Sequence, residues 1–360
     1  MSNPFENAKG NFGFGCMRLK MDGDKVDAAE FAAMTDAFME AGFNYFDTAH
    51  GYIDGKSELA IRDGLCARYP RESFVLVNKL SDWFFNSREE IVPLFEKQLE
   101  ACGTDYFDIY LLHAVNKDNY EKKYKGMNAF EEVAALKEQG RVKHMGFSFH
   151  DKADVLDRIL TEQPQVEVVQ LQFNYLDYLS EDVQAKACYE VCCKHGKPVI
   201  VMEPVRGGRL VNLPKKAEKI LTDLGGSPAS YAIRFAAGFP NVKMVLSGMG
   251  DMAMMRENTA FMKNFKPLDE GEMAAVEQVR KMVESQNLID CTGCRYCMDV
   301  CPAGIPIPEL FAAVNDRRSC KASTVSPEPA TRCMDCGACE STCPQHLPIR
   351  SLLTQAAEEL

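Results

Sequence analysis

Short runs of β-branched and aromatic residues alternate with amphipathic stretches over the first two thirds of the chain. Eight such pairs follow one another, a pattern typical of βαβ units that build a parallel sheet. Strands are predicted at residues 10–15, 44–47, 74–79, 107–113, 142–148, 168–174, 199–202 and 242–247. Helices are predicted at residues 27–41, 57–68, 87–102, 127–139, 151–162, 180–195, 228–237 and 251–263.

The number of repeats favours a closed barrel. Eight strand–helix pairs in roughly 250 residues are the size of a (β/α)8 TIM barrel, although an open doubly wound sheet gives a similar alternation. Segment 205–226, rich in Gly, Pro and Lys, is longer than a usual βα loop, and we expect it at the C-terminal face, where it could cover a substrate.

The chain is also expected to hold a second, smaller domain. Residues 267–286 have the pattern of an amphipathic helix, with Met273, Val276, Val279 and Val283 on one side. We therefore predict an α/β chain with a barrel at 1–265, a connecting helix at 266–286 and a small second domain at 287–360.

Composition and charge narrow the range of functions. A formal net charge of -11 would repel polyphosphate, so nucleic-acid binding is not expected. The first residues lack an apolar signal region, and no uninterrupted apolar run approaches the ~18 residues of a membrane span. The sequence predicts a cytoplasmic protein that acts on small molecules.

Nine of the fifteen cysteines lie from Cys291 onward, and eight of these nine form two copies of C-x2-C-x2-C-x3-C-P. In such runs three thiolates hold one cubane and the fourth ligates the other, which predicts two [4Fe-4S] clusters. The first ligand set is Cys291, Cys294, Cys297 and Cys343; the second is Cys301, Cys333, Cys336 and Cys339.

A pair of zinc sites is the alternative reading of these C-x2-C pairs, although zinc does not call for four cysteines per run or a following Pro. The segment resembles the bacterial two-cluster ferredoxins over about fifty residues. The resemblance implies that the second domain at 287–360 is a small ferredoxin-like iron–sulfur domain and that it carries out one-electron transfer. Clusters that only stabilise a small domain are the competing interpretation.

Four polar residues follow successive predicted strands where barrel catalysis is expected: Asp47, Tyr52, Lys79 and His113. Each alone is weak evidence. Together, segments 44–52, 57–58, 78–79 and 108–113 resemble the aldo-keto reductase signature, and the resemblance continues through 140–143, 146–148, Gln170 and 256–258.

The resemblance implies reduction of a carbonyl, or oxidation of an alcohol, by hydride transfer from NADPH or NADH. Tyr52 would exchange the proton, Lys79 would favour the phenolate, Asp47 would hold Lys79, and His113 would orient the substrate oxygen. By position, the resemblance assigns cofactor contacts to Gly15, Cys16, Met17, Ser148, Gln170, Glu257 and Asn258.

Three departures concern the cofactor. Phe149 follows Ser148 where the family often has Asn, Met202 replaces an aromatic residue, and the loop at 247–251 lacks the Lys or Arg that often meet the 2′-phosphate. NADH and a flavin therefore stay open beside NADPH.

Two further alternatives concern partners. The barrel could be non-catalytic and serve an iron–sulfur electron-transfer or redox-sensing protein. Residues 117–125, with Tyr120 and Tyr124 among lysines, are expected to form a solvated loop, and docking of an acidic ferredoxin is the alternative.

Overall fold

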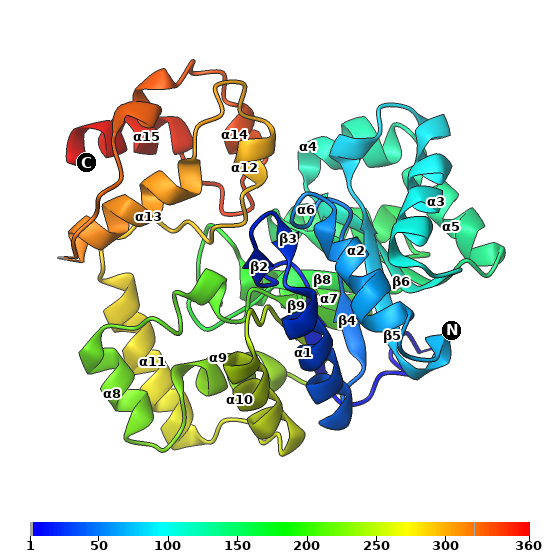
Figure 1. The fold of residues 1–360 in the computed structure, drawn as a ribbon, viewed down its shortest axis with the longest axis horizontal. Helices are drawn as coiled ribbons and strands as arrows, with labels where there is room; N and C mark the ends of the chain where they lie inside the picture. Colours follow the sequence, from blue (N-terminus) through cyan, green and yellow to red (C-terminus); the bar gives the residue numbers. More distant parts are fainter. Residues whose placement is uncertain (1–2, 320) are drawn as a thin grey trace. The chain divides into compact units, whose positions relative to one another are not determined.

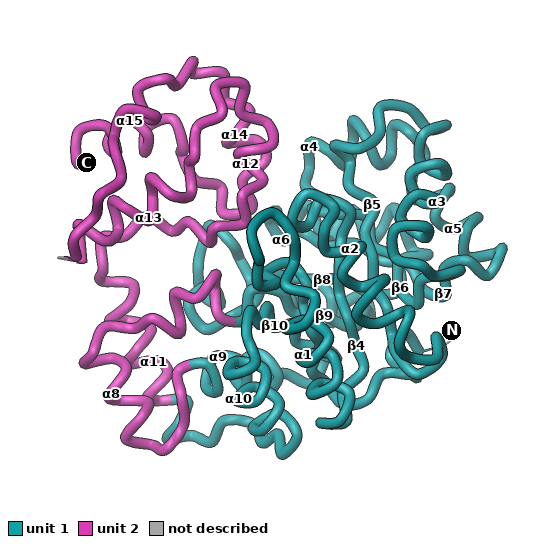
Figure 2. Tube along the Cα trace, in the orientation of Figure 1, with its two compact units in different colours: residues 1–204, 229–273 teal, residues 205–228, 274–360 magenta. Residues whose placement is uncertain are grey.

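A computed structural model describes residues 3–319 and 321–360. These residues form two compact units (Figure 2). Unit 1 comprises the chain up to Pro204 together with Ala229–Met273, and unit 2 comprises Val205–Pro228 together with Ala274–Leu360. The predicted domain limits at residues 265 and 286 stay a prediction.

Unit 1 is built on a closed barrel of eight parallel strands (Figure 1), which confirms the predicted (β/α)8 fold. The order around the barrel is β1-β10-β9-β8-β7-β6-β5-β4, and β1 pairs with both β10 and β4. The strands are β1 (Phe12–Gly15), β4 (Tyr45–Asp47), β5 (Val75–Leu80), β6 (Phe107–Val115), β7 (Val142–Phe149), β8 (Val168–Gln172), β9 (Val199–Met202) and β10 (Val242–Ser247). A small hairpin, β2 (Met21–Asp22) with β3 (Lys25–Val26), follows β1.

Helices connect the successive strands. Local signals set several of their ends: the Asp27 side chain accepts from the Glu30 backbone N–H at the start of α1, and Gly103 ends α3 with φ 64°. The helices are α1 (Ala28–Glu40), α2 (Lys56–Ile61), α3 (Ile91–Cys102), α5 (Ala129–Glu138), α6 (Ala153–Glu162), α7 (Ala185–Lys194), α9 (Pro228–Ala237) and α10 (Met252–Lys263). The predicted helix at 57–68 is instead α2 followed by a π-helical turn, Arg62–Cys66.

The prediction of a solvated loop at 117–125 is wrong. This segment forms a short helix, α4 (Lys117–Asn119), and a π-helix, Tyr120–Lys125. Tyr120 and Tyr124 are both fully buried, and the Tyr124 hydroxyl donates to the carbonyl oxygens of Leu80 and His113 at 3.0 and 2.6 Å. Two aromatic residues four positions apart lie on one helix face, and their burial outweighs the polarity of the intervening lysines.

The lower part of the barrel interior is apolar. Side chains from most of the strands pack there, among them Tyr45, Val77, Ile109, Leu111, Val168, Ile200 and Met244. At Gly146 the neighbouring strand comes so close that a Cβ would lie 2.1 Å from the carbonyl oxygen of Val168. The polar residues of the strands lie above this layer, toward the carboxyl ends.

Unit 2 contains short helices around its own core. These are α8 (Lys215–Thr222), most of α11 (Glu270–Glu284), α12 (Tyr296–Asp299), α13 (Ile307–Arg318), α14 (Ala338–Ser341) and α15 (Ile349–Glu359). Leu310, Phe311, Val314 and Leu353 are at the centre of the core. On α11 the three valines predicted for the buried side are buried, whereas Met273 is 40% exposed.

Segment 205–228 lies in unit 2, although it follows β9 and precedes most of α9 in the sequence. Its predicted role as a cover for a substrate stays a prediction. Over the described part of the chain, no helix combines the length and the hydropathy that a membrane crossing requires.

Candidate active site and cluster sites

The four predicted catalytic residues come together at the carboxyl end of the barrel. Asp47 ends β4, Lys79 is the penultimate residue of β5, His113 lies near the end of β6, and Tyr52 follows β4. All four are more than nine-tenths buried. Because β4, β5 and β6 are neighbours in the barrel, the ends of these strands must present their side chains to one space.

Lys79 is the centre of this group. Its Nζ donates to Asp47 Oδ1 at 2.6 Å and to the carbonyl oxygen of Thr48 at 2.7 Å. The same Nζ lies 4.7 Å from the centroid of the Tyr52 ring, and that ring meets the His113 ring edge to face at a centroid distance of 5.8 Å. A phenol thus lies between an ammonium and an imidazole.

Burial controls the ionisation of these groups. Burial lowers the pKa of Lys79 and raises that of Asp47, while the attraction between the two charges opposes both shifts. Burial, with the nearby Lys79 charge, also lowers the pKa of His113 well below its usual range. His113 is therefore a neutral imidazole at pH 7, able to donate one hydrogen bond and to accept another.

A buried polar network supports the strand ends from behind. Glu58 on α2 accepts from Asn78 Nδ2 at 2.8 Å and contacts His50 Nδ1 at 2.7 Å. Gln98 on α3 donates to Asn78 Oδ1 and to the Lys79 carbonyl oxygen at 3.0 and 2.9 Å. These contacts fix the backbone that carries Lys79. For most of these residues the only sign in the sequence is a polar residue on an otherwise apolar face.

His113 has close partners that the sequence analysis missed. Its Nδ1 lies 2.6 Å from the hydroxyl of Ser81, which is fully buried. Trp83, in the turn after β5, has its ring centroid 5.1 Å from that of His113. The period of two along a strand could have indicated Ser81, since residues two apart point to one side, as Lys79 and Ser81 do.

Two predicted cofactor residues lie opposite one another on neighbouring strands. Ser148 on β7 and Gln170 on β8 are register partners, and both are buried. Ser148 Oγ accepts from the Ala114 backbone N–H at 2.7 Å. Gln170 Nε2 contacts Met202 Sδ at 3.4 Å, whereas its buried Oε1 has no hydrogen-bond partner among the described residues. A buried amide oxygen without a partner is costly, so a donor from a bound molecule fits this position.

The turn after β1 holds the next three predicted residues. Gly15 ends β1, and the Cys16 backbone N–H donates to the Asp47 carbonyl oxygen at 2.8 Å. Burial raises the pKa of the Cys16 thiol well above its ordinary value, so Cys16 is a neutral buried side chain. Met17 follows it and is partly exposed. The hydrogen bond to Asp47 holds the turn against β4, and the turn can present its backbone to a ligand.

The last two predicted cofactor residues lie on α10. Asn258 is buried and its Nδ2 donates to Ser247 Oγ, at the end of β10, at 3.1 Å; Glu257 is exposed. The first turn of α10 already has two carboxylate partners: Asp251 Oδ1 accepts from the Met254 backbone N–H at 2.8 Å, and Glu30 Oε1 accepts from that of Met252 at 2.9 Å. The anion-binding end of this helix is thus occupied by negative side chains.

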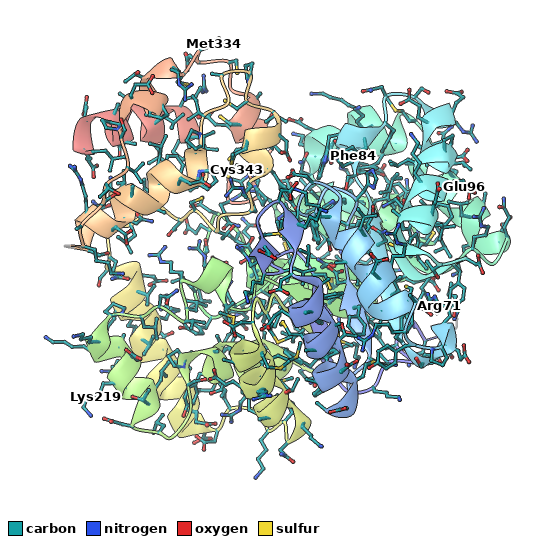
Figure 3. The ribbon with its side chains drawn as sticks, in the orientation of Figure 1. Arg71, Phe84, Glu96, Lys219, Met334 and Cys343 are labelled. Atoms are coloured by element: carbon teal, nitrogen blue, oxygen red, sulfur yellow. The ribbon has the colours of Figure 1, made fainter. Side chains whose placement is uncertain are left out.

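In unit 2 the eight motif cysteines surround two hollows of about 330 and 320 Å³ of empty space, including open solvent. Cys343, labelled in Figure 3, belongs to the second C-x2-C-x2-C-x3-C-P run, yet it shares a hollow with cysteines of the first run. One hollow is lined by Cys301, Cys333, Cys336 and Cys339, and the other by Cys291, Cys294, Cys297 and Cys343.

These are the two crossed sets that the motif spacing predicts. Within residues 3–319 and 321–360, no three metal-ligating side chains converge on one point. Four thiols facing a hollow are a donor set that fits an iron–sulfur cubane.

Comparison with known families agrees with both parts of the chain. Residues 11–281 match the aldo/keto reductase family, and residues 290–347 match the 4Fe-4S dicluster domain. Among curated proteins, the uncharacterized oxidoreductase YqkF of Bacillus subtilis is 25% identical over 304 residues, which cover 75% of this chain and 92% of that protein.

Solved structures show the same fold. An aldo-keto reductase, AKR11C1 of Bacillus halodurans in its holo form, superposes with a TM-score of 0.62 at 23% identity, covering 75% of this chain and 92% of its own. An aldo-keto reductase of Klebsiella pneumoniae in complex with NADPH gives a TM-score of 0.61 at 18% identity, covering 75% and 90%.

Proposed function

Because this chain belongs to the aldo/keto reductase family and carries a 4Fe-4S dicluster domain, we propose that it reduces a small carbonyl compound to an alcohol, or catalyses the reverse reaction. The observation that carries this proposal is the placement of Lys79. Its ammonium contacts Asp47 at 2.6 Å and lies 4.7 Å from the Tyr52 ring centroid.

Tyr52 would act as the general acid. Its hydroxyl proton passes to the carbonyl oxygen as the carbonyl carbon accepts hydride, and the nearby Lys79 ammonium stabilises the phenolate that remains. Asp47 holds Lys79 in place. In the direction of alcohol oxidation, the same phenolate takes the proton back.

His113 would orient the substrate oxygen. His113 is neutral, and with the Ser81 hydroxyl as the donor to Nδ1 the ring proton would lie on Nε2, from which it would be donated to the substrate. Ser81 is thus proposed as a positioning residue that selects the tautomer. Trp83, beside His113, would form an apolar wall for the substrate.

Bound NADH or NADPH would supply the hydride. Ser148 and the unpartnered Gln170 Oε1 would hold its carboxamide, and the Gly15–Met17 turn would present backbone to it. Of the two nucleotides we propose a preference for NADH, because a 2′-phosphate near the start of α10 would meet the carboxylates of Asp251 and Glu30.

The eight cysteines would hold two [4Fe-4S] clusters that exchange single electrons with a partner such as a ferredoxin, or that stabilise unit 2. Hydride transfer moves two electrons and each cluster one, so a direct link between the two chemistries requires a group such as a flavin. Thiolate ligands of this kind favour a reducing compartment, which supports a cytoplasmic location.

The test of the enzymatic proposal is Tyr52→Phe, assayed anaerobically with NADH and a panel of small aldehydes and ketones. We expect a loss of kcat of at least about a hundredfold, because the proton donor is removed. Nucleotide binding should be retained, and the quenching of Trp83 fluorescence measures it. Tyr106→Phe is the matched control. It removes the hydroxyl of a ring on which Arg71 stacks, outside the candidate active site, and it should keep full activity.

Full activity of Tyr52→Phe would contradict the assignment of the proton donor. For the nucleotide preference, the ratio of kcat/KM with NADH to that with NADPH should exceed one in the native protein. Asp251→Asn should lower this ratio, and an unchanged ratio would contradict the role given to the α10 carboxylates.

A further inference from the structure

The turn at the start of segment 205–228 packs against the first ligand turn of the cluster domain. Both belong to unit 2, so the contact lies inside one compact body. Arg206–Gly208 forms a 3-10 turn in which Arg206, Gly207 and Gly208 all have positive φ. Three consecutive residues in this region of backbone conformation are unusual and are retained only where the surroundings require them.

Gly207 shows what the surroundings require. A Cβ at this position would lie 2.5 Å from the carbonyl oxygen of Thr292 and 2.8 Å from its Cα. Thr292 follows the ligand Cys291 and lines the hollow of the first cysteine set. The backbone of the turn therefore touches the backbone of the ligand loop directly, and only glycine permits this approach.

Two guanidinium groups converge beside the same ligand loop. Arg206 Nη1 lies 3.1 Å from Asp290 Oδ1, and Arg209 Nη1 contacts the same oxygen. Asp290 immediately precedes Cys291. Arg206 is only 6% exposed and Arg209 17%, whereas Asp290 is 44% exposed. Both guanidinium groups share this carboxylate, and because buried charges are screened less than exposed ones, their field at the ligand loop is less screened than that of Asp290.

The second cysteine set has a different electrostatic environment. Asp335 lies within its ligand loop and Glu340 follows the ligand Cys339, while Arg350 is shared between these two carboxylates at 3.1 and 2.8 Å. Arg350 is 41% exposed, and Met334, labelled in Figure 3, is 62% exposed in the same loop. Arg332, which precedes the ligand Cys333, pairs with Glu328 at 3.8 Å, so these five charged groups sum to one negative charge, and they are more open to solvent.

We propose that Arg206 and Arg209 tune the first cluster, raising its reduction potential above that of the second. This inference rests on the proposed presence of two clusters. A [4Fe-4S] centre gains one negative charge when it accepts one electron, so neighbouring positive charge favours the reduced form and neighbouring negative charge opposes it. An electron that enters the second, more exposed cluster then moves to the first. There it lies next to the Arg206–Gly208 turn, which follows β9 in the sequence.

The experiment is an anaerobic redox titration of the full chain, followed by electron paramagnetic resonance of the reduced clusters. Arg209→Gln should lower one of the two potentials and leave the other in place. At an effective dielectric constant near 20, we expect about a tenfold change in the equilibrium constant for electron uptake, or about 59 mV for one electron.

Two companion variants separate electrostatics from structural damage. Asp290→Asn removes the counter-charge and should raise the same potential that Arg209→Gln lowers, whereas a merely structural role would not reverse the sign. Arg350→Gln, the matched change beside the other cysteine set, should lower the second potential only.

Iron and sulfide analysis of each variant is done first. About eight irons with two titrating signals in the native protein, and potentials that do not move in Arg209→Gln or Asp290→Asn, would overturn the inference while leaving the proposed clusters intact. A native protein without two clusters would overturn both.

Discussion

The Asp47–Lys79 ion pair allows a quantitative test of how unit 1 tolerates buried charge. Lys79 is fully buried and Asp47 is 2% exposed, so neither charge has access to water. Removing one partner leaves the other charge buried and unpaired, which costs about 3 to 5 kcal/mol. Lys79→Met in addition leaves the Thr48 carbonyl oxygen without the 2.7 Å bond that it now accepts.

We therefore expect Lys79→Met and Asp47→Asn each to lower the free energy of unfolding by about 4 kcal/mol. In the double variant no buried charge remains, and only polar groups without a partner, such as the Thr48 carbonyl oxygen, should still cost stability. The loss should then be about 2 kcal/mol rather than the sum of about 8. The coupling energy of this double-mutant cycle is then about 6 kcal/mol.

Trp83 makes the measurement specific to the barrel. It is the single tryptophan of the chain, and it lies in the turn after β5, beside His113. Urea unfolding followed by its fluorescence reports on unit 1, and an unchanged slope against urea shows that the variants unfold the same surface. Additive losses, equal to the sum within about 0.5 kcal/mol, would refute the reasoning that the two charges depend on each other.

Three further predictions follow from single features. Burial raises the pKa of Glu167, but bonds from His144 and Lys137 outweigh it and lower this pKa to about 2, so its contribution to stability is present above the unfolded value near 4.5 and is lost as the pH falls toward 2; the Tm difference between native protein and Glu167→Gln, read from Trp83, should be large at pH 7 and should narrow steadily as the pH falls from about 4.5 to about 2. Gly146→Ala would press a Cβ to 2.1 Å from the Val168 carbonyl oxygen and should cost about 3 kcal/mol, whereas Gly271→Ala on the exposed face of α11 should not destabilise; equal effects would contradict the close approach of β7 to β8. Removal of iron by a chelator should lower the melting temperature of unit 2 in circular dichroism and leave the Trp83 transition in place, and loss of both together would show that the cysteines do not stabilise unit 2 separately.

The barrel was predictable because its signal is repeated and local. The limits of β9 and β10 agree with the prediction at both ends, since the runs of Val, Ile, Leu and Met there have no competing pattern. The helix at 117–125 was missed because charged residues hide the spacing of Tyr120 and Tyr124. Composition could not show that segment 205–228 belongs to unit 2. That placement depends on contacts with residues some eighty positions later, such as the hydrogen bond from Arg209 to the Val283 carbonyl oxygen.

The candidate site likewise contains residues that the sequence pattern indicates and residues that it does not. Asp47, Tyr52, Lys79 and His113 follow strand ends, so their meeting depends on the barrel alone. Ser81 and Gln98 act through side-chain geometry at atomic distance, which a linear pattern does not specify. The crossed sharing of cysteines between the two hollows, by contrast, follows from motif spacing, because three consecutive ligands span one cubane and the fourth cannot.

The discontinuous make-up of unit 2 has a consequence for biosynthesis and for truncation. Segment 205–228 leaves the ribosome before α9, β10 and α10, while its partners at 283–292 follow tens of residues later, a delay of seconds at ordinary rates of translation. Until then the surface of Arg206 and Gly207 that later meets Asp290 and Thr292 stays exposed. A shortened chain that ends at residue 273 would keep this exposed surface permanently, so it should aggregate unless residues 205–228 are shortened as well.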